Sequence, residues 1–244
     1  MKNHFSQEMA SLKKNIQQVA ELVDTQLEFA IRAMQTGNME LCKFVRSRDR
    51  EIDAYDNLIQ AQCENILALF QPVAGDLRFI MAALMINNQL ERCGDIAVNI
   101  VQRVQKTVDN RKLLEEIGLQ QLGEEARGMA RDAIEAFINN NLELAEAIRA
   151  RDDQVDDHCR AIFDTLIARM QAQSEWVEPG AHFIVLSRHL ERLADHATNI
   201  AEEVIFLIEA RIVAHQGDQK GRLPLNKPPR SNRAEESAAA GNNP

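Results

Sequence analysis

The sequence predicts an all-α fold of two tandem three-helix bundles, with six long helices related by an internal pseudo-two-fold repeat. Composition is the first observation behind this prediction. Ala, Leu, Ile, Glu, Arg and Gln are abundant, aromatic residues make up only 5%, and long unbranched side chains lose little freedom in a helix. The second observation is a helical period of apolar residues between widely spaced breakers. The third is an internal repeat of sequence.

The breakers place the helix boundaries. We predict helices over residues 5–36, 39–70, 76–109, 112–139, 142–174 and 180–215. The joints are Gly-Asn at 37–38, Gln-Pro at 71–72, Asp-Asn at 109–110, three Asn at 139–141 and Glu-Pro-Gly at 178–180. Most of these helices have about 30 residues, a length that is typical of bundles.

The repeat divides the chain into two units. The segment NMELCKFVRSRDREID at 38–53 matches NLELAEAIRARDDQVD at 141–156, and LERCGDIAVNI at 90–100 matches LERLADHATNI at 190–200. The offsets, 103 and 100, differ by a change in loop length. We therefore predict a first repeat over 1–110 and a second over 111–215. From residue 216 the period stops, and we expect a disordered tail over 216–244.

Charge and patterning exclude several classes of protein. The net charge of −9 argues against nucleic-acid binding, which needs a basic surface. No apolar run reaches the roughly 18 residues of a membrane span, and the N-terminus lacks a signal peptide, so we expect a cytoplasmic protein without direct membrane insertion. The four Cys residues show no zinc spacing and are expected to be small core residues in a reducing compartment.

Acidic pairs at a spacing of four residues recur in both repeats. They are Asp49 with Asp53, Glu91 with Asp95, Asp152 with Asp156, and Glu191 with Asp195. Each pair shares one helix face, where like charges repel by roughly 0.2–0.5 kcal/mol. Counting in sevens places the first acid of every pair inside the apolar stripe and the second at its margin. Such carboxylates need a cation as a partner.

Two kinds of cation remain open as that partner. Arginines could form an ion-pair network; the candidates are Arg46, Arg48, Arg92, Arg149, Arg151 and Arg192. Alternatively, the eight acids, with Asn99 as a further candidate, could hold metal ions between helices. Oxygen ligands suit hard ions, and we expect iron first, with zinc, manganese or magnesium as alternatives, and no organic cofactor. His158 and His196 could add nitrogen ligands in the second repeat only.

Several segments resemble the signatures of a known family. QPVAGDLR at 71–78, LERCGDIAVNI at 90–100 and LERLADHATNIAEEV at 190–204 are similar to those of the PhoU family, the accessory regulators of bacterial phosphate-specific transport. The resemblance spans about residues 5 to 212. It implies two similar three-helix bundles and an E/DxxxD motif that binds metal in some members. That motif falls on the eight acids named above. Ala194 departs from the pattern, because the family has Gly there, as this chain does at Gly94.

The resemblance also implies a function. Family members act between the phosphate ABC transporter, through its ATPase and permease, and a sensor histidine kinase, and they restrain starvation signalling when phosphate is plentiful. They are commonly homodimers.

We expect no enzyme, because no nucleophile elbow, P-loop or Gly-rich dinucleotide turn is present. Metal buffering is one alternative function. A di-iron carboxylate redox enzyme is the other, although no His has the Glu three residues before it that such a site requires.

Overall fold

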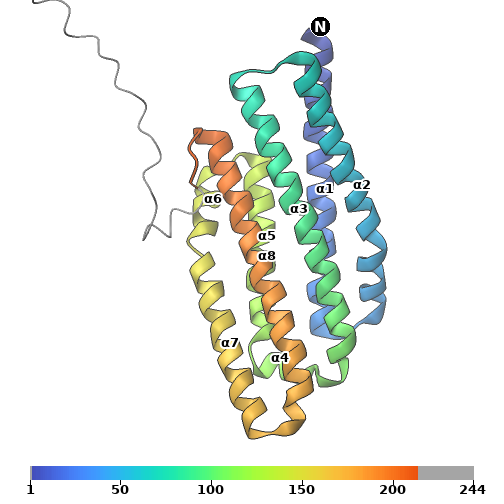
Figure 1. Ribbon diagram of the computed structural model, residues 1–244, viewed down its shortest axis with the longest axis vertical. Coiled ribbons are helices and arrows are strands. Elements are labelled where there is room, and N and C mark those ends of the chain that lie inside the picture. Colours follow the sequence, from blue (N-terminus) through green and yellow to red (C-terminus); the bar gives the residue numbers. More distant parts are fainter. Residues whose placement is uncertain (1, 214–244) are drawn as a thin grey trace, which may run out of the picture. The chain divides into compact units, whose positions relative to one another are not determined.

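Long helices make up nearly all of residues 2–213, the part of the chain that the computed structural model describes (Figure 1). No strand occurs among these residues, which confirms the predicted all-α class. The first three helices are α1 (Lys2–Thr36), α2 (Met39–Phe70) and α3 (Ala74–Thr107). Their bounds lie within three residues of the predicted ones. The expected disordered tail over 216–244 lies outside the described residues.

The second half is more interrupted than predicted. Its elements are η1 (Val108–Asn110), α4 (Lys112–Glu116), α5 (Leu119–Asn139), α6 (Leu142–Arg149), α7 (Asp152–Ala172), η2 (Ser174–Trp176) and α8 (Val177–Glu209). The predicted helix over 112–139 breaks at Gly118, whose φ of 80° an L side chain rarely adopts. The predicted helix over 142–174 breaks at 150–151, directly before Asp152.

The last helix was misplaced at both ends. It begins at Val177 rather than 180, because Pro179 is tolerated in a first turn, where its missing N–H has no partner to lose. It ends at Glu209 rather than 215, where Ala210 takes a left-handed conformation and donates its N–H to the Phe206 carbonyl. The Asn joints were placed correctly: Asn38 and Asn141 cap α2 and α6 by accepting backbone N–H bonds with their side chains.

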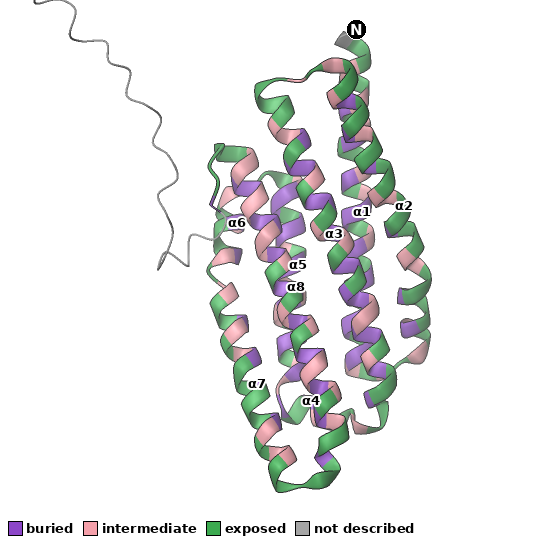
Figure 2. Cartoon of the chain, in the orientation of Figure 1, coloured by how far each residue is buried: buried purple, intermediate pink, exposed green. Residues whose placement is uncertain are grey.

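The helices of each half pack against one another as a bundle. α1, α2 and α3 contact one another, α5 contacts α6, α7 and α8, and α8 contacts α6 and α7. The halves meet where α3 packs against α8 and α1 against α5. Buried residues follow these four helices, whereas α2 and α7 lie at the outer edges and are largely exposed (Figure 2). The predicted acids therefore lie where outer helices meet central ones.

Within residues 2–213, none of the helices is both long and apolar enough to cross a membrane.

Candidate functional site

The acids of the first half gather along the line where α2 meets α3. Asp49 and Glu91 are half-buried, and Asp53 and Asp95 are exposed. We predicted that the first acid of each pair lies inside the apolar stripe, but Asp49 and Glu91 are buried only in part. They lie at the rim of the interface, because a heptad count drifts relative to the true helical period over several turns.

Mutual electrostatics show that these acids converge. Burial raises the pKa of Asp49, and the charges of Asp53 and Asp95 raise it further, while a hydrogen bond from Gln26 opposes the rise. Burial also raises the pKa of Glu91, with Asp95 as the next cause. Carboxylates that raise each other's pKa repel, and an external cation would relieve that repulsion.

Asp56 is a fifth acid of this cluster, and the sequence reasoning missed it. Its charge contributes to the raised pKa of Glu91. The side-chain amide of Asn87 donates to Asp56 Oδ1 at 2.7 Å and to its backbone carbonyl at 3.3 Å. Asp56 is absent from the repeated acid pattern, because its counterpart in the second repeat is Cys159. Its position three residues after Asp53, on the same helix face, was the available signal.

The second half places its four acids in the same way, between α7 and α8. Asp152 is the first residue of α7, where the positive end of the helix dipole favours a carboxylate, and it accepts a hydrogen bond from Thr198 Oγ1 at 3.0 Å. Burial raises the pKa of Asp156, with Asp152 as the next cause. Loss of hydration, followed by the charges of Asp152, Asp156 and Glu191, raises the pKa of Asp195 to about 6.

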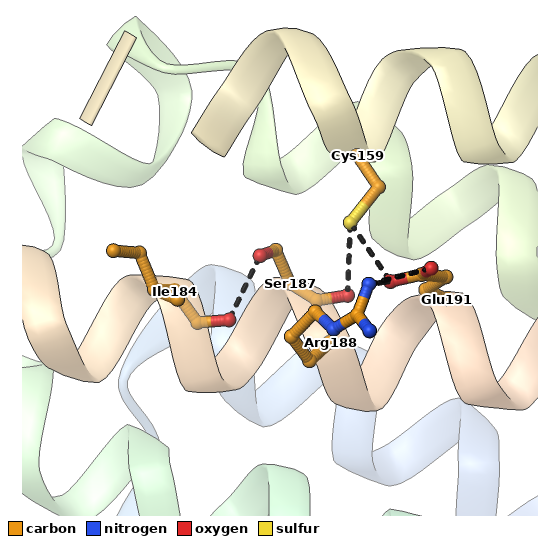
Figure 3. A network of polar contacts seen from close by, with 5 residues as sticks. All are labelled: Cys159, Ile184, Ser187, Arg188 and Glu191. Carbon is orange, nitrogen blue, oxygen red and sulfur yellow. Dashed lines mark hydrogen bonds and ion pairs between the residues drawn. The ribbon is translucent and has the colours of Figure 1, made fainter. Parts of the chain in front are cut away.

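Among the residues that the structure describes, Glu191, unlike its counterpart Glu91, forms an ion pair and accepts a hydrogen bond from a neighbouring thiol (Figure 3). The Arg188 guanidinium lies 2.7 Å from one carboxylate oxygen and 2.5 Å from the other. The Cys159 thiol donates to Glu191 Oε2 at 3.2 Å and to the Ser187 carbonyl at 3.8 Å. Burial and the neighbouring carboxylate raise the pKa of this thiol to about 11, so it remains a protonated donor. One acid of the second cluster is thus neutralised internally.

The predicted arginine network is otherwise not what the structure shows. Three of the six candidate arginines form ion pairs, and each uses another acid: Arg48 with Glu51, Arg149 with Glu202 and Arg151 with Asp132. Within residues 2–213, Glu191 is the one predicted acid in an ion pair, and its partner, Arg188, was not among the candidates. None of the six candidate arginines therefore forms an ion pair with one of the eight acids within residues 2–213, although the charge of Arg92 partly opposes the burial that raises the pKa of Glu91.

The two histidines considered as ligands lie elsewhere. His158 Nδ1 lies 2.8 Å from Glu125 on α5, and His196 Nδ1 lies 2.7 Å from Gln89 on α3. Neither ring contacts an acid cluster, and a di-iron site with histidine ligands gains no support. Asn199, the counterpart of Asn99, also bonds to Gln89 rather than to an acid.

The carboxylates of the clusters have the right chemistry for a metal ion, but their side chains are not positioned around one. All donors of the first cluster are carboxylates, which suit hard cations. As the side chains stand, however, no three His, Cys, Asp or Glu side chains among the described residues are placed to hold one ion. A metal ion at the first cluster would therefore need the exposed side chains of Asp53 and Asp95 to change conformation.

Gly94 and Ala194 occupy equivalent buried positions next to the clusters. A Cβ at Gly94 would lie 3.2 Å from Gln26 Oε1 and 3.2 Å from Ile52 Cδ1, which is tight. In the second repeat the counterpart of Ile52 is Val155, one methylene smaller. The smaller neighbour leaves volume for the Ala194 methyl group, so the departure at Ala194 is matched by a second substitution.

Comparison with known proteins identifies the family. The PhoU domain model matches residues 16–104 and, a second time, residues 119–204. The chain therefore belongs to the PhoU family. The two matched ranges contain the two acid clusters, one in each range.

PhoU relatives cover most of this chain. A phosphate-specific transport system accessory protein PhoU homolog of Caulobacter vibrioides is 31% identical over 204 residues, which are 83% of this chain and 88% of the relative. The crystal structure of PhoU from Pseudomonas aeruginosa superimposes with a TM-score of 0.78 at 28% identity, over 85% of this chain and 100% of that one. The phosphate transport system regulatory protein PhoU from Streptococcus pneumoniae gives the same score at 29% identity, over 86% and 99%.

Proposed function

We propose that this chain is a non-catalytic accessory regulator of phosphate transport. In this proposal it acts in the cytoplasm as an adaptor between the ATPase and permease of a phosphate ABC transporter and a sensor histidine kinase, and it restrains phosphate-starvation signalling when phosphate is plentiful. The observation that carries the proposal is the match of the PhoU domain to both repeats, together with relatives named as transport accessory proteins that cover most of the chain.

An exposed apolar stripe supports a role in protein contacts. Leu77, Met81 and Met85 lie one turn apart along α3 and are 39–48% exposed, and Val73, which is 74% exposed, directly precedes the helix. Apolar side chains at this spacing form a single face of a helix, and such faces are typical of protein-binding surfaces. A homodimer is part of the proposal, and light scattering of the purified protein would test it.

A metal-dependent role for the acid clusters completes the proposal. Asp49, Asp53, Glu91 and Asp95 would hold one cation centre and Asp152, Asp156, Glu191 and Asp195 the other, with iron expected first. A bound ion would supply the positive charge that relieves the repulsion within each cluster. It would act as a structural or regulatory ion rather than as a catalyst.

Deletion of the gene tests the regulatory function. A reporter of phosphate-starvation genes should become active in phosphate-rich medium, because the restraint on signalling is lost. Complementation with the intact chain should restore repression. A deletion strain with unchanged reporter activity would contradict the proposal.

The double substitution Glu91→Ala and Asp95→Ala tests the metal. We expect metal content to fall and repression to weaken, while far-UV circular dichroism shows that the helices remain. Loss of helicity would instead show that the acids hold the bundle together. Metal that exchanges without any change in repression would favour metal buffering as the function.

A further inference from the structure

The seam between α3 and α8 brings two arginines from different halves to the same level. The helices run antiparallel (Figure 1), and Gln89 Oε1 accepts hydrogen bonds from His196 Nδ1 at 2.7 Å and Asn199 Nδ2 at 3.3 Å. Arg92 follows Gln89 by one turn, and Arg192 precedes His196 by one turn. Because the helices are antiparallel, these two steps go in the same direction. Arg92 and Arg192 therefore lie opposite each other across the seam.

Neither arginine is held in an ion pair in the described part of the chain, although the charge of Arg92 partly opposes the burial that raises the pKa of the neighbouring Glu91. Both are exposed, and neither takes part in any ion pair within the described residues, although arginines elsewhere, such as Arg127 and Arg169, are paired. The charges of both arginines also act on His196, a side chain within the seam. Burial, followed by the charges of Arg192 and Arg92, lowers the pKa of His196 to about 4, so the ring is neutral at physiological pH. The seam thus carries two exposed arginines that form no ion pair within residues 2–213.

The polar groups between the arginines add hydrogen-bond donors. Gln89 uses its carbonyl oxygen for two incoming bonds, which holds the amide in place. Its Nε2 group donates to no acceptor among residues 2–213. Farther along the same seam, burial lowers the pKa of His189 on α8, and the charge of Arg103 on α3 lowers it further. The surface is therefore rich in donors, in a chain with a net charge of −9.

We propose that Arg92 and Arg192 form a binding site for one phosphate-type oxyanion, bridged across the seam between the two halves. A guanidinium offers paired N–H donors that match two oxygens of a tetrahedral anion, and two guanidinium groups facing each other repel unless an anion lies between them. The acid clusters, by contrast, suit cations. Since each half contributes one arginine, anion binding stabilises the packing of the halves. This site goes beyond the proposed regulatory function and can be measured without the transporter.

The same chemistry has two sources, free inorganic phosphate and the phosphate group of a phosphomonoester. Both present three or more terminal oxygens and negative charge to the arginines. We test them separately, with inorganic phosphate and with methyl phosphate as probes, in chloride buffer and after treatment with a chelator. Removal of metal ensures that neither probe binds through a cation at the acid clusters.

The experiment compares two double variants by isothermal titration calorimetry. Arg92→Gln with Arg192→Gln removes the site, whereas Arg32→Gln with Arg50→Gln removes the same charge from exposed arginines that form no ion pair in the described part of the chain. We expect binding of one phosphate per chain to weaken by roughly tenfold or more in the seam variant and by less than about twofold in the control. Nuclear magnetic resonance signals of the Arg92 and Arg192 Nε–H groups should shift on addition of phosphate.

The outcomes separate clearly. Tighter binding of inorganic phosphate than of methyl phosphate supports free phosphate as the ligand, and tighter binding of methyl phosphate supports a phosphomonoester. Equal weakening in the two double variants would overturn the proposal, because it would show a non-specific effect of net charge. Absence of binding of either probe to the intact chain at about 50 mM, weaker than any useful affinity, would also overturn it.

Discussion

The two acid clusters occupy equivalent positions in the two repeats but differ in their counter-charge. Both contain the same four acid positions, between α2 and α3 in the first half and between α7 and α8 in the second. Their neighbours are Asp56, Asn57 and Asn88 in the first half, against Cys159, Arg160 and Arg188 in the second. The first cluster gains an acid, whereas the second gains two arginines and a thiol donor.

This difference predicts which cluster would bind an external cation more tightly. In the second half, Arg188 pairs with Glu191, and the charge of Arg160 lowers the otherwise raised pKa of Asp156. In the first half, none of the predicted acids takes part in an ion pair among the described residues. The first cluster is therefore the stronger candidate for metal, because no ion pair holds any of its acids within the described residues and the charge of Arg92 only partly opposes the burial that raises the pKa of Glu91.

Exchange of the residues at positions 88 and 188 should have the largest effect on this comparison. Asn88→Arg places a cation beside Glu91, and we expect the first half to bind Mn²⁺ roughly tenfold more weakly, because like charges compete for the same carboxylates. Arg188→Asn frees Glu191, and we expect the second half to bind Mn²⁺ more tightly. Calorimetric titration with Mn²⁺ measures both.

Each substitution is measured in a chain whose other cluster lacks two of its candidate ligands. Glu191→Ala with Asp195→Ala removes them from the second cluster, and Glu91→Ala with Asp95→Ala removes them from the first. If Arg188→Asn left the second half's affinity unchanged, internal neutralisation would not explain the difference between the halves.

The packing next to the clusters gives a smaller effect. Gly94→Ala should destabilise the chain by up to about 1 kcal/mol, because crowding against Gln26 and Ile52 exceeds the gain in helix propensity. The loss should shrink in an Ile52→Val background, which reproduces the arrangement of Val155 and Ala194. Urea unfolding of the two single variants and the double variant yields the coupling free energy. Additive effects would show that the two positions do not share one space.

The pH dependence of Asp195 gives the smallest effect. Its folded-state pKa of about 6 lies above the ordinary value of 3.8. The protonated form is therefore favoured by folding, and the stability it contributes is present below pH 4 and lost as the pH rises through 6. Asp195→Asn should raise Tm by roughly 1–3 °C at pH 7.5, an effect limited by solvent screening, and by much less at pH 4.5. Calorimetric scans at both values check this, and an equal shift at both would contradict the assigned cause.

Local signals in the sequence predicted most of the first half. The bounds of α2 over 39–70 and the Asn38 cap follow from breakers and periodicity, which depend on neighbouring residues alone. The same signals failed at Gly118 and at residues 150–151. A single Gly or a short kink costs little in a helix, so tertiary packing decides whether the helix continues. The boundaries of the two repeats as separate domains remain a prediction.

The sequence alone predicted the helical class, the duplicated architecture and the four acid pairs, because each depends only on composition, period and repetition along the chain. The partners of those acids depended on tertiary structure. Arg188 reaches Glu191 within its own helix, whereas Cys159 and Asp56 reach their partners across helices. The charges of Arg92 and Arg192 both act on His196 only because α3 packs against α8. Spacing along one helix shows which side chains share a face, but the rotation of each helix against its neighbours decides what that face meets.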